Sequence, residues 1–271
     1  MSEQVVRVEN LRKEFPGHRG AATVAAVDGV GFELASGEAL AIVGESGSGK
    51  TTVARMLMGL ERPTSGTIEV CGRERSGRPS TAERRRRARE VQLVFQDPFL
   101  SLDRAQRIGS AIETAIRLQF PVGRDELRRR TSELLEQVGL LPRHAELFPR
   151  QLSGGQRQRV AIARALAAEP SVLVLDEAVA ALDVSIQAQI LNLLSDIRES
   201  REIAYLFISH DLAVVNQLCE RTIVMRRGKV VEAGATRHLL TAPAEDYTRR
   251  LIDAVPRPGW VPTRSRDLAG A

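Results

Sequence analysis

The stretch "ALAIVGESGSGKTTVARMLMGL", residues 39–60, decides the fold of this chain. Its first five residues form an unbroken apolar run, which is typical of a strand buried on both faces. A glycine-rich segment follows directly, and residues 50–60 then carry apolar side chains at helical spacing. These side chains are Val53, Met56, Leu57 and Leu60. The stretch therefore predicts a buried strand, a tight loop and a helix that begins at the loop.

The loop itself, "GESGSGKT" (44–51), fits the pattern G-x-x-x-x-G-K-[S/T] in full. Glycines let successive backbone N–H groups point inward at phosphate oxygens, and the helix N-terminus adds a favourable dipole. Lys50 supplies charge to the β- and γ-phosphates, and the Thr51 hydroxyl is placed to ligate Mg²⁺. The pattern predicts a site for a nucleoside triphosphate with Mg²⁺. The predicted nucleotide-binding residues are Gly44, Glu45, Ser46, Gly47, Ser48, Gly49, Lys50, Thr51 and Thr52.

Two adjacent acids end the apolar segment "VLVLDE" (172–177). Ligands of parallel sheets bind at the carboxyl ends of the strands, where the glycine-rich loop also lies. Asp176 is then placed to hold Mg²⁺. Glu177, one residue further, can orient or deprotonate the water that attacks the γ-phosphate.

Two further polar residues follow apolar strands. His210 comes after "IAYLFIS" (203–209), and Gln96 comes after "VQLVF" (91–95). A single histidine is more often structural, but its place at the carboxyl end of a predicted strand favours a γ-phosphate contact. The amide of Gln96 could ligate the metal or the attacking water.

A second glycine pair, in "LSGGQ" (152–156), begins another predicted helix. With it, the motifs stand in one order: "GESGSGKT", the glutamine loop "FQDPFLSL" (95–102), "LSGGQ", "VLVLDE", the D-loop "ALD" (181–183) and His210. In this order they resemble the ATP-binding subunit of ABC transporters over nearly the whole chain. The segments "VFQDPFLSLD", "ALDVSIQAQILNLL", "ISHDLAVV" and "DYTRRLIDAVP" are more narrowly similar to the dipeptide/oligopeptide importer branch. That branch includes importers of peptides, glutathione and nickel.

Alternating strands and helices indicate an α/β protein with a parallel sheet, and helical periodicity dominates from about 97 to 168. The resemblance implies a P-loop NTPase of ABC type. Such a protein has a RecA-like, mostly parallel core sheet, an antiparallel β subdomain and an inserted helical subdomain. We expect one ATP-binding domain over residues 1–255 and a C-terminal tail over 256–271.

The resemblance also implies a mechanism in which two ATPase subunits pair head to tail around ATP. The signature, which is "LSGGQ" (152–156), and the D-loop would contact the ATP of the partner, through Ser153, Gly154, Gly155, Gln156 and Asp183. The partner is either a second copy or, as is frequent in this branch, a different ATPase subunit. The pair would drive a transmembrane permease and, indirectly, serve an extracytoplasmic solute-binding protein.

Some residues depart from the family pattern. Ala178 replaces a proline after the catalytic acid, and Phe15 stands where a tyrosine usually stacks on adenine. Some members of the branch carry a C-terminal cysteine cluster, but the last cysteine here is Cys219. We therefore expect no iron–sulfur cluster.

The net charge of +5 comes with two arginine clusters, "ERRRRARE" (83–90) and "RDELRRR" (124–130). They favour solvated helix faces, although a partner such as nucleic acid or an anionic membrane remains open. The aromatic content of 4% argues against base stacking, so no nucleic-acid partner is expected. The alternative function is a non-transport ABC ATPase acting on nucleic acid or the ribosome. Without an apolar run of about 18 residues or a signal-peptide pattern, we expect a cytoplasmic protein. The resemblance implies that it is peripheral, on the cytoplasmic face of the cell membrane.

Overall fold

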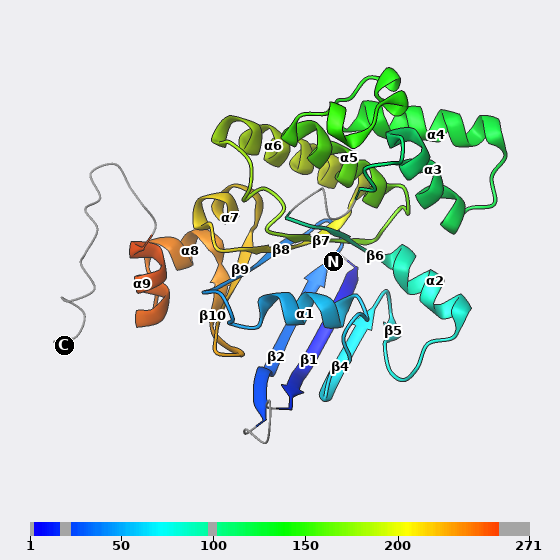
Figure 1. Cartoon of the computed structure of the whole chain (residues 1–271). Helices are drawn as coiled ribbons and strands as arrows, with labels where there is room; N and C mark the ends of the chain where they lie inside the picture. Colours follow the sequence, from blue (N-terminus) through cyan, green and yellow to red (C-terminus); the bar gives the residue numbers. More distant parts are fainter. Residues whose placement is uncertain (1–2, 17–22, 97–101, 255–271) are drawn as a thin grey trace.

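The computed structural model describes residues 3–16, 23–96 and 102–254 and arranges them as two β-sheets with helices around them (Figure 1). The larger sheet has the strand order β10-β9-β3-β8-β7-β6. Its strands are β3 (Ala39–Val43), β6 (Val91–Val94), β7 (Val172–Asp176), β8 (Ala204–Ser209), β9 (Arg221–Arg226) and β10 (Lys229–Ala235). Neighbouring strands are parallel except β9 and β10, which form an antiparallel hairpin at one edge. The prediction of a mostly parallel core sheet is confirmed.

The smaller sheet is antiparallel, with the order β2-β1-β4-β5. Its strands are β1 (Gln4–Phe15), β2 (Val24–Ala35), β4 (Ser65–Val70) and β5 (Arg73–Glu74). Strand β1 spans 12 residues. The pairing with β2 and β4 continues past a register shift near Asn10, which has a positive φ of 46°.

Alternate residues of the central strands enter two separate cores. Leu40 and Ile42 of β3 pack with the smaller sheet and helix α1 (Lys50–Leu57), whereas Ala39, Ala41 and Val43 pack with helices on the opposite face. All five side chains are 0% exposed. Because the core sheet is covered on both faces, its strands are continuously apolar, as expected for buried parallel strands.

Helices α3, α4 and α5 lie between β6 and β7 in the chain and cover one end of the molecule (Figure 1). The helices after α1 are α2 (Thr81–Glu90), α3 (Ile108–Gln119), α4 (Arg124–Gln137), α5 (Gly154–Leu166), α6 (Val184–Arg201), α7 (Leu212–Leu218), α8 (Thr236–Thr241) and α9 (Asp246–Asp253). Short 3₁₀ turns at Pro142–Glu146 and Pro149–Gln151 precede α5. The helical periodicity of this region is confirmed. The exact limits 97–168 stay a prediction, because residues 97–101 lie outside the described chain.

Helix α1 is shorter than the periodicity of residues 50–60 predicts, and the placement of Leu60 on its apolar face was wrong. The helix ends at Leu57, and Leu60 is 65% exposed. The N–H of Gly59 donates to the Met56 carbonyl at 3.0 Å, and the N–H of Leu60 donates to the Arg55 carbonyl at 2.9 Å. This pair of bonds is a Schellman cap, which turns the chain away from the helix axis before Leu60.

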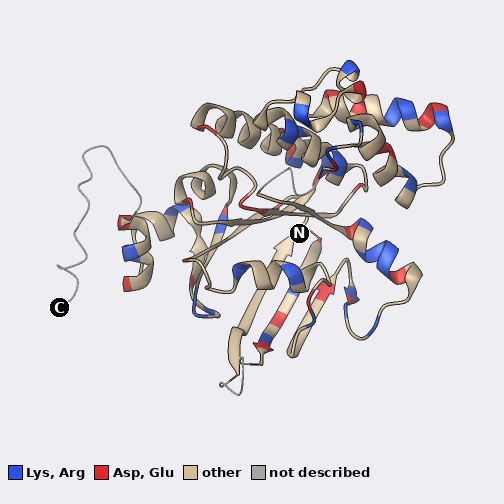
Figure 2. Cartoon of the chain, viewed as in Figure 1, with Lys and Arg blue, Asp and Glu red and all other residues tan. Residues whose placement is uncertain are grey.

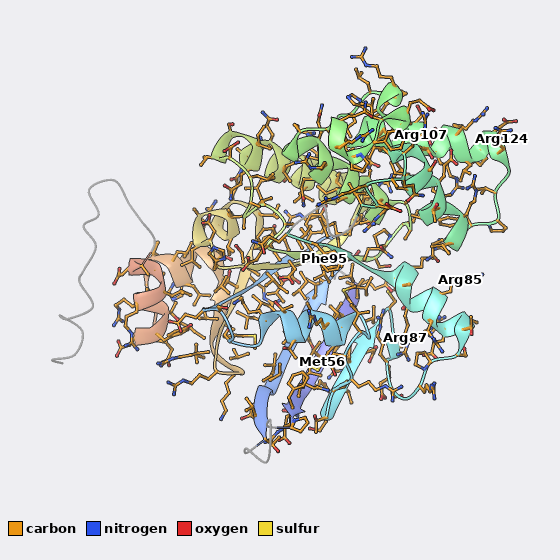
Figure 3. All side chains as sticks on the ribbon, in the orientation of Figure 1. Met56, Arg85, Arg87, Phe95, Arg107 and Arg124 are labelled. Carbon is orange, nitrogen blue, oxygen red and sulfur yellow. The ribbon has the colours of Figure 1, made fainter. Side chains whose placement is uncertain are left out.

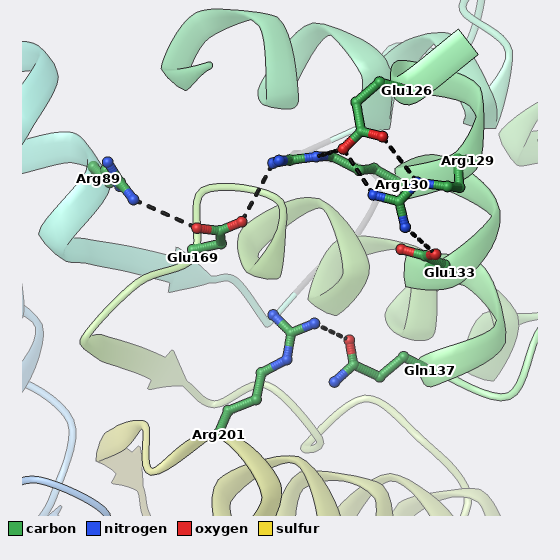
Figure 4. A network of polar contacts seen from close by, with 8 residues as sticks. All are labelled: Arg89, Glu126, Arg129, Arg130, Glu133, Gln137, Glu169 and Arg201. Atoms are coloured by element: carbon green, nitrogen blue, oxygen red, sulfur yellow. Dashed lines mark hydrogen bonds and ion pairs between the residues drawn. The ribbon is translucent and has the colours of Figure 1, made fainter. Parts of the chain in front are cut away.

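A polar network joins the helical insert to the rest of the chain (Figure 4). Glu169, in the loop between α5 and β7, contacts Arg89 of α2 and Arg130 of α4, each at 3.4 Å. Both guanidinium groups also lie over the Phe120 ring, 4.6 and 5.0 Å from its centroid. Arg130 of the second cluster, 124–130, therefore links two elements and is not only part of a solvated helix face.

Among the described residues, no helix combines the length and apolarity that crossing a membrane requires.

Candidate functional site

A cleft of about 730 Å³ opens at the carboxyl edge of the core sheet. The loop between β3 and α1 forms one side of it, and residues that follow β7 and β8 reach it from the neighbouring strands. Its lining residues are Ala26, Ser46, Gly47, Gly49, Lys50, Thr51, Thr52, Glu177 and His210. The structure thus brings together the glycine-rich loop, Glu177 and His210, which are distant in the sequence.

Lys50 is a buried cation held by the loop that precedes it. Its Nζ donates to the carbonyls of Gly44 and Glu45, at 2.7 and 2.8 Å, and lies 3.4 Å from Ser48 Oγ. Burial lowers the pKa of Lys50, and this effect is opposed by the charges of Glu177, Asp176 and Glu45. The loop therefore already holds the Lys50 ammonium group in a position where it can bind phosphate oxygens.

Neighbouring strands fix the shape of the loop from outside. Gly49 has a φ of 105°, and a Cβ at this position would come within 2.3 Å of the Ala26 carbonyl on β2. On the other side, the N–H of Gly228, in the β9–β10 turn, donates to the Ser48 carbonyl at 3.0 Å. Glycine at position 49 is thus required both by the backbone conformation and by the close approach of β2.

Tyr247 of α9 also contacts the loop, and the sequence motifs did not reveal this contact. The N–H of Glu45 donates to the Tyr247 hydroxyl at 3.1 Å. The Tyr247 side chain is buried, and Arg226 lies 4.8 Å from its ring centroid. The one sequence signal was the likeness of "DYTRRLIDAVP" to a family segment, which says nothing about a contact with residue 45.

Asp176 and Glu177 stand at the end of β7 in different environments. Burial raises the pKa of Asp176 above its ordinary value, and the neighbouring Glu177 charge adds to this rise. Lys50, Arg55 and a hydrogen bond from Thr51 oppose it. The Thr51 and Asp176 oxygens are therefore neighbours, as the sequence analysis expected for a shared metal ion.

Glu177 adopts a backbone conformation that is unusual for a non-glycine residue, with a φ of 49°. Its N–H donates to the Ile208 carbonyl of β8 at 2.9 Å, which fixes the turn. His210 Nδ1 lies 3.0 Å from Glu177 Oε1, so the ring donates to the carboxylate. The next residue, Ala178, is buried, so the position where the family has proline packs into the core here.

Phe15 and Gln96 are predicted site residues that do not line the cleft. Gly44, Glu45, Ser48 and Asp176 are not among its lining residues either, although they are close in sequence to residues that are. Phe15 ends β1 and is 38% exposed, with Lys13 Nζ 4.8 Å from its ring centroid. Gln96 is exposed two residues after β6. The rest of the glutamine loop up to Ser101 lies outside the described residues.

The second glycine pair forms the start of α5 and is separate from the cleft. Ser153 Oγ accepts from the N–H of Gln156 at 3.2 Å, and Gln156 Oε1 accepts from the N–H of Ser153 at 2.9 Å. This capping box orders the first turn of α5. A Cβ on Gly155 would meet Ile186 of α6 at 2.5 Å, so α5 and α6 pack closely there. Asp183 is exposed at the start of α6. None of Ser153, Gly154, Gly155, Gln156 and Asp183 lines the cleft around Lys50.

Comparisons with known proteins agree with this arrangement. The family model described as ABC transporter matches residues 27–180, more than half of the chain. The chain is 43% identical over 268 residues to the di/tripeptide transport ATP-binding protein DppF of Pseudomonas aeruginosa, covering 97% of this chain and 83% of that protein. It is 47% identical over 259 residues to the glutathione import ATP-binding protein GsiA of Escherichia coli, covering 94% of this chain and 41% of GsiA.

A solved structure shares the fold. The dimeric structure of a post-hydrolysis state of an ATP-binding cassette bound to ADP and Pi superimposes with a TM-score of 0.76 at 29% identity. The match covers 86% of this chain and 99% of that one. The resemblance drawn from the motifs and the expected fold class are confirmed. With its glycine-rich loop, Glu177 and His210 on one cleft, the chain belongs to the ABC transporter family.

Proposed function

We propose that this chain is the ATP-binding and ATP-hydrolysing subunit of an ABC importer for peptides or a related small solute. The observation that carries the proposal is the common cleft of Lys50, Glu177 and His210 at the carboxyl edge of the parallel sheet. A buried cation on a glycine-rich loop suits a polyphosphate, and a carboxylate with a histidine partner suits the activation of water.

The triphosphate would lie against the first turn of α1. Lys50 supplies positive charge, and the backbone N–H groups of the loop supply donors at the positive end of the helix dipole. The residues proposed for this role are Gly44, Glu45, Ser46, Gly47, Ser48, Gly49, Lys50, Thr51 and Thr52. Phe15 would stack on the adenine ring from the end of β1, where its ring is exposed.

The oxygen atoms beside Lys50 fit Mg²⁺. Thr51 and Asp176 supply hard oxygen donors, and Gln96 could add an amide oxygen. The described residues contain no group of three or more His, Cys, Asp or Glu side chains that could hold a metal by themselves. This fits Mg²⁺ that is bound by few protein oxygens and whose coordination shell is completed by phosphate oxygens. When bound, Mg²⁺ would neutralise charge on the β- and γ-phosphate oxygens.

Glu177 would orient the attacking water and accept its proton. His210 donates to this carboxylate from Nδ1, which fixes the direction of the carboxylate. Nε2 would donate to the γ-phosphate when the ring carries a proton on both nitrogens. Gln96 would contribute to the placement of the water or the metal.

The signature at the start of α5 would bind the ATP held by a partner ATPase. Ser153, Gly154, Gly155 and Gln156 begin a helix, where N–H groups suit an anion, and Asp183 lies at the start of the adjacent α6. The exposed Ser153 supports a contact with another subunit. That subunit is a second copy of this chain or a different ATPase.

ATP binding would close the pair, and hydrolysis would open it, so that a permease alternates between two states. The partners would be the permease and, indirectly, a solute-binding protein. Contact with the permease would place this chain on the cytoplasmic side of the membrane. Relatives named for di/tripeptides and for glutathione support a small peptide-like solute.

Uptake by cells that lack the gene tests the proposal. A plasmid with the wild-type gene should restore uptake of labelled di- or tripeptides or glutathione, and Lys50→Ala should not, because the buried cation of the phosphate site is lost. Restoration by Lys50→Ala at the wild-type level would contradict an ATP-driven role for this cleft.

A further inference from the structure

Residues 73–90 carry all of the excess positive charge of this chain. The segment holds eight arginines and three glutamates, a net charge of +5, and the whole chain also has a net charge of +5. It comprises β5, the following loop and α2, which is strongly basic in Figure 2. Outside these 18 residues, acids and bases are equal in number.

The inner side of α2 uses most of the local acids. Glu90 contacts Arg75 at 3.1 Å and Arg86 at 3.3 Å. Glu83 forms an ion pair with Arg87, which is 8% exposed and also donates to the Ser76 carbonyl at 3.2 Å. These arginines hold the loop and α2 together. The expectation that the cluster 83–90 forms a solvated helix face was wrong for Arg87, which is buried.

The outer side of α2 and its loop carries arginines that pair with no carboxylate in the part of the chain that the structure describes. Arg78, Arg84 and Arg85 are exposed, and none has a carboxylate within 4 Å among the described residues. The Arg84 side chain donates to the Pro79 carbonyl at 3.4 Å, which keeps it beside the loop of Arg78. Figure 3 labels Arg85 and the buried Arg87 on the same helix. We call Arg78, Arg84 and Arg85 the α2 basic surface.

The composition of the segment restricts what this surface can bind. Residues 73–90 include no Val, Leu, Ile, Met, Phe, Tyr or Trp. Protein interfaces depend on buried aromatic and apolar anchors, amphipathic helices insert apolar side chains into lipid, and single-stranded nucleic acids need stacking platforms. The surface is therefore suited to a spread-out layer of negative charge that is bound by electrostatics alone.

The position of α2 favours one such layer. Ala88 of α2 and Gln92 of β6 line a cavity of about 330 Å³ together with Asp103 and Gln106, which directly follow the glutamine loop. The resemblance to ABC transporters implies that the glutamine loop contacts the cytoplasmic side of the permease, so α2 would lie on the side of the chain that approaches the bilayer. This step rests on the proposed function.

We propose that the α2 basic surface binds the anionic phospholipid headgroups of the membrane. Each arginine near such a surface strengthens binding by roughly fivefold at moderate salt. The contact would hold the ATPase subunit against the bilayer beside its permease, independently of nucleotide.

Flotation of the purified full-length chain with lipid vesicles tests this directly. Binding should be found with vesicles of phosphatidylcholine plus phosphatidylglycerol, should be absent with phosphatidylcholine alone, and should weaken as salt is added. The double variant Arg84→Gln/Arg85→Gln should bind about 25-fold more weakly. Glutamine keeps the helix propensity of α2.

The double variant Arg237→Gln/Arg250→Gln is the matched control. Both residues are exposed on α8 and α9, have no carboxylate within 4 Å among the described residues, and give the same change in net charge. This variant should bind anionic vesicles like the wild type. The proposal would be overturned if both double variants lost anionic-vesicle binding to the same extent. It would also be overturned if the wild type bound neutral vesicles as tightly as anionic ones.

Two further readouts separate the possible failures. Tighter binding to duplex DNA or RNA than to anionic vesicles, abolished by Arg84→Gln/Arg85→Gln, would assign the surface to nucleic acid and overturn the membrane proposal. ATP binding is measured on the same samples. Lost vesicle binding in the wild type with intact ATP binding refutes the membrane contact alone, whereas absent ATP binding refutes the proposed function.

Discussion

His210 Nδ1 and Glu177 Oε1 lie 3.0 Å apart across the ends of two neighbouring parallel strands, β7 and β8. The Glu177 backbone is bonded to the Ile208 carbonyl, so the turn after β7 is attached to the strand that carries His210. The carboxylate therefore has its direction set before any substrate binds, as a residue that orients water needs.

Replacement of His210 by alanine should therefore slow hydrolysis much more than it weakens ATP binding. The carboxylate of Glu177 loses the donor that orients it, and the γ-phosphate loses any contact with a doubly protonated His210 ring. We expect the rate of phosphate release to fall about 100-fold, with nucleotide affinity measured by fluorescent ATP within a fewfold of wild type. A wild-type rate in this variant would show that the pair has no part in turnover.

Tyr247→Phe should raise the KM for ATP and leave kcat nearly unchanged. The ring stays in the core, but the N–H of Glu45 loses its acceptor, so the loop that binds phosphate is less well ordered. A neutral hydrogen bond of this kind corresponds to about 3- to 10-fold in affinity.

Tyr205→Phe is the control for this change. Tyr205 is fully buried and donates its hydroxyl to the Leu194 carbonyl at 2.9 Å, away from the cleft. Loss of this hydroxyl should lower the melting temperature and leave the KM for ATP unchanged. Similar KM values for both variants would mean that Tyr247 acts only on stability.

Asp176→Asn should stabilise the nucleotide-free chain at neutral pH. Burial and Glu177 raise the pKa of Asp176 above its usual 3.8, so the folded chain holds this proton more tightly than the unfolded chain does. The protonated Asp176 carboxyl favours the folded chain. This contribution to the free energy of unfolding is lost as the pH rises from about 4 through the raised pKa of the folded state. Asparagine removes the ionised group, and the melting temperature should rise by about 2–4 °C for each kcal/mol gained.

The difference in melting temperature between Asp176→Asn and wild type should become smaller at acidic pH, where Asp176 of the wild type becomes protonated. Calorimetric melting of both proteins without nucleotide, across a pH series, measures it. A variant that is less stable than wild type at pH 7.5 would show that Asp176 is favourably ionised in the free protein.

Ser153→Arg should spare ATP binding in the cleft of its own chain and impair turnover by the assembled pair. Ser153 is exposed at the start of α5 and does not line that cleft, while a bulky cation would obstruct the ATP of a partner. Nucleotide affinity of the isolated chain and ATP turnover of the assembled complex are the two measurements. Loss of affinity in the isolated chain would contradict a role toward the partner.

The glycine-rich loop, the apolar strands and the residues at their carboxyl ends could be predicted because each is local in the sequence. The spacing around Lys50 predicts a loop and helix, and β7 predicts where Asp176 and Glu177 stand. The contact of Glu45 with Tyr247 could not be predicted, because it joins residues about two hundred positions apart through one hydroxyl. Leu60 was misplaced because apolar spacing does not reveal the cap at Gly59 that ends α1.

The charge pattern shows the same limit. The sequence shows an arginine cluster at 83–90, but only the fold separates the buried Arg87 from the exposed Arg84 and Arg85. Which arginine meets a glutamate depends on the loop before α2 and on Glu169, an acid that follows α5.

The central claim is that ATP bound beside Lys50 is hydrolysed with the help of Glu177, and phosphate release by Glu177→Gln tests it most directly. The measurement compares wild type and variant at saturating ATP and Mg²⁺, with bound ATP quantified on the same samples. We expect unchanged or tighter ATP binding and a rate lower by about 100-fold or more, because glutamine cannot accept the proton of the attacking water. Turnover at the wild-type rate by a variant that binds ATP would contradict it.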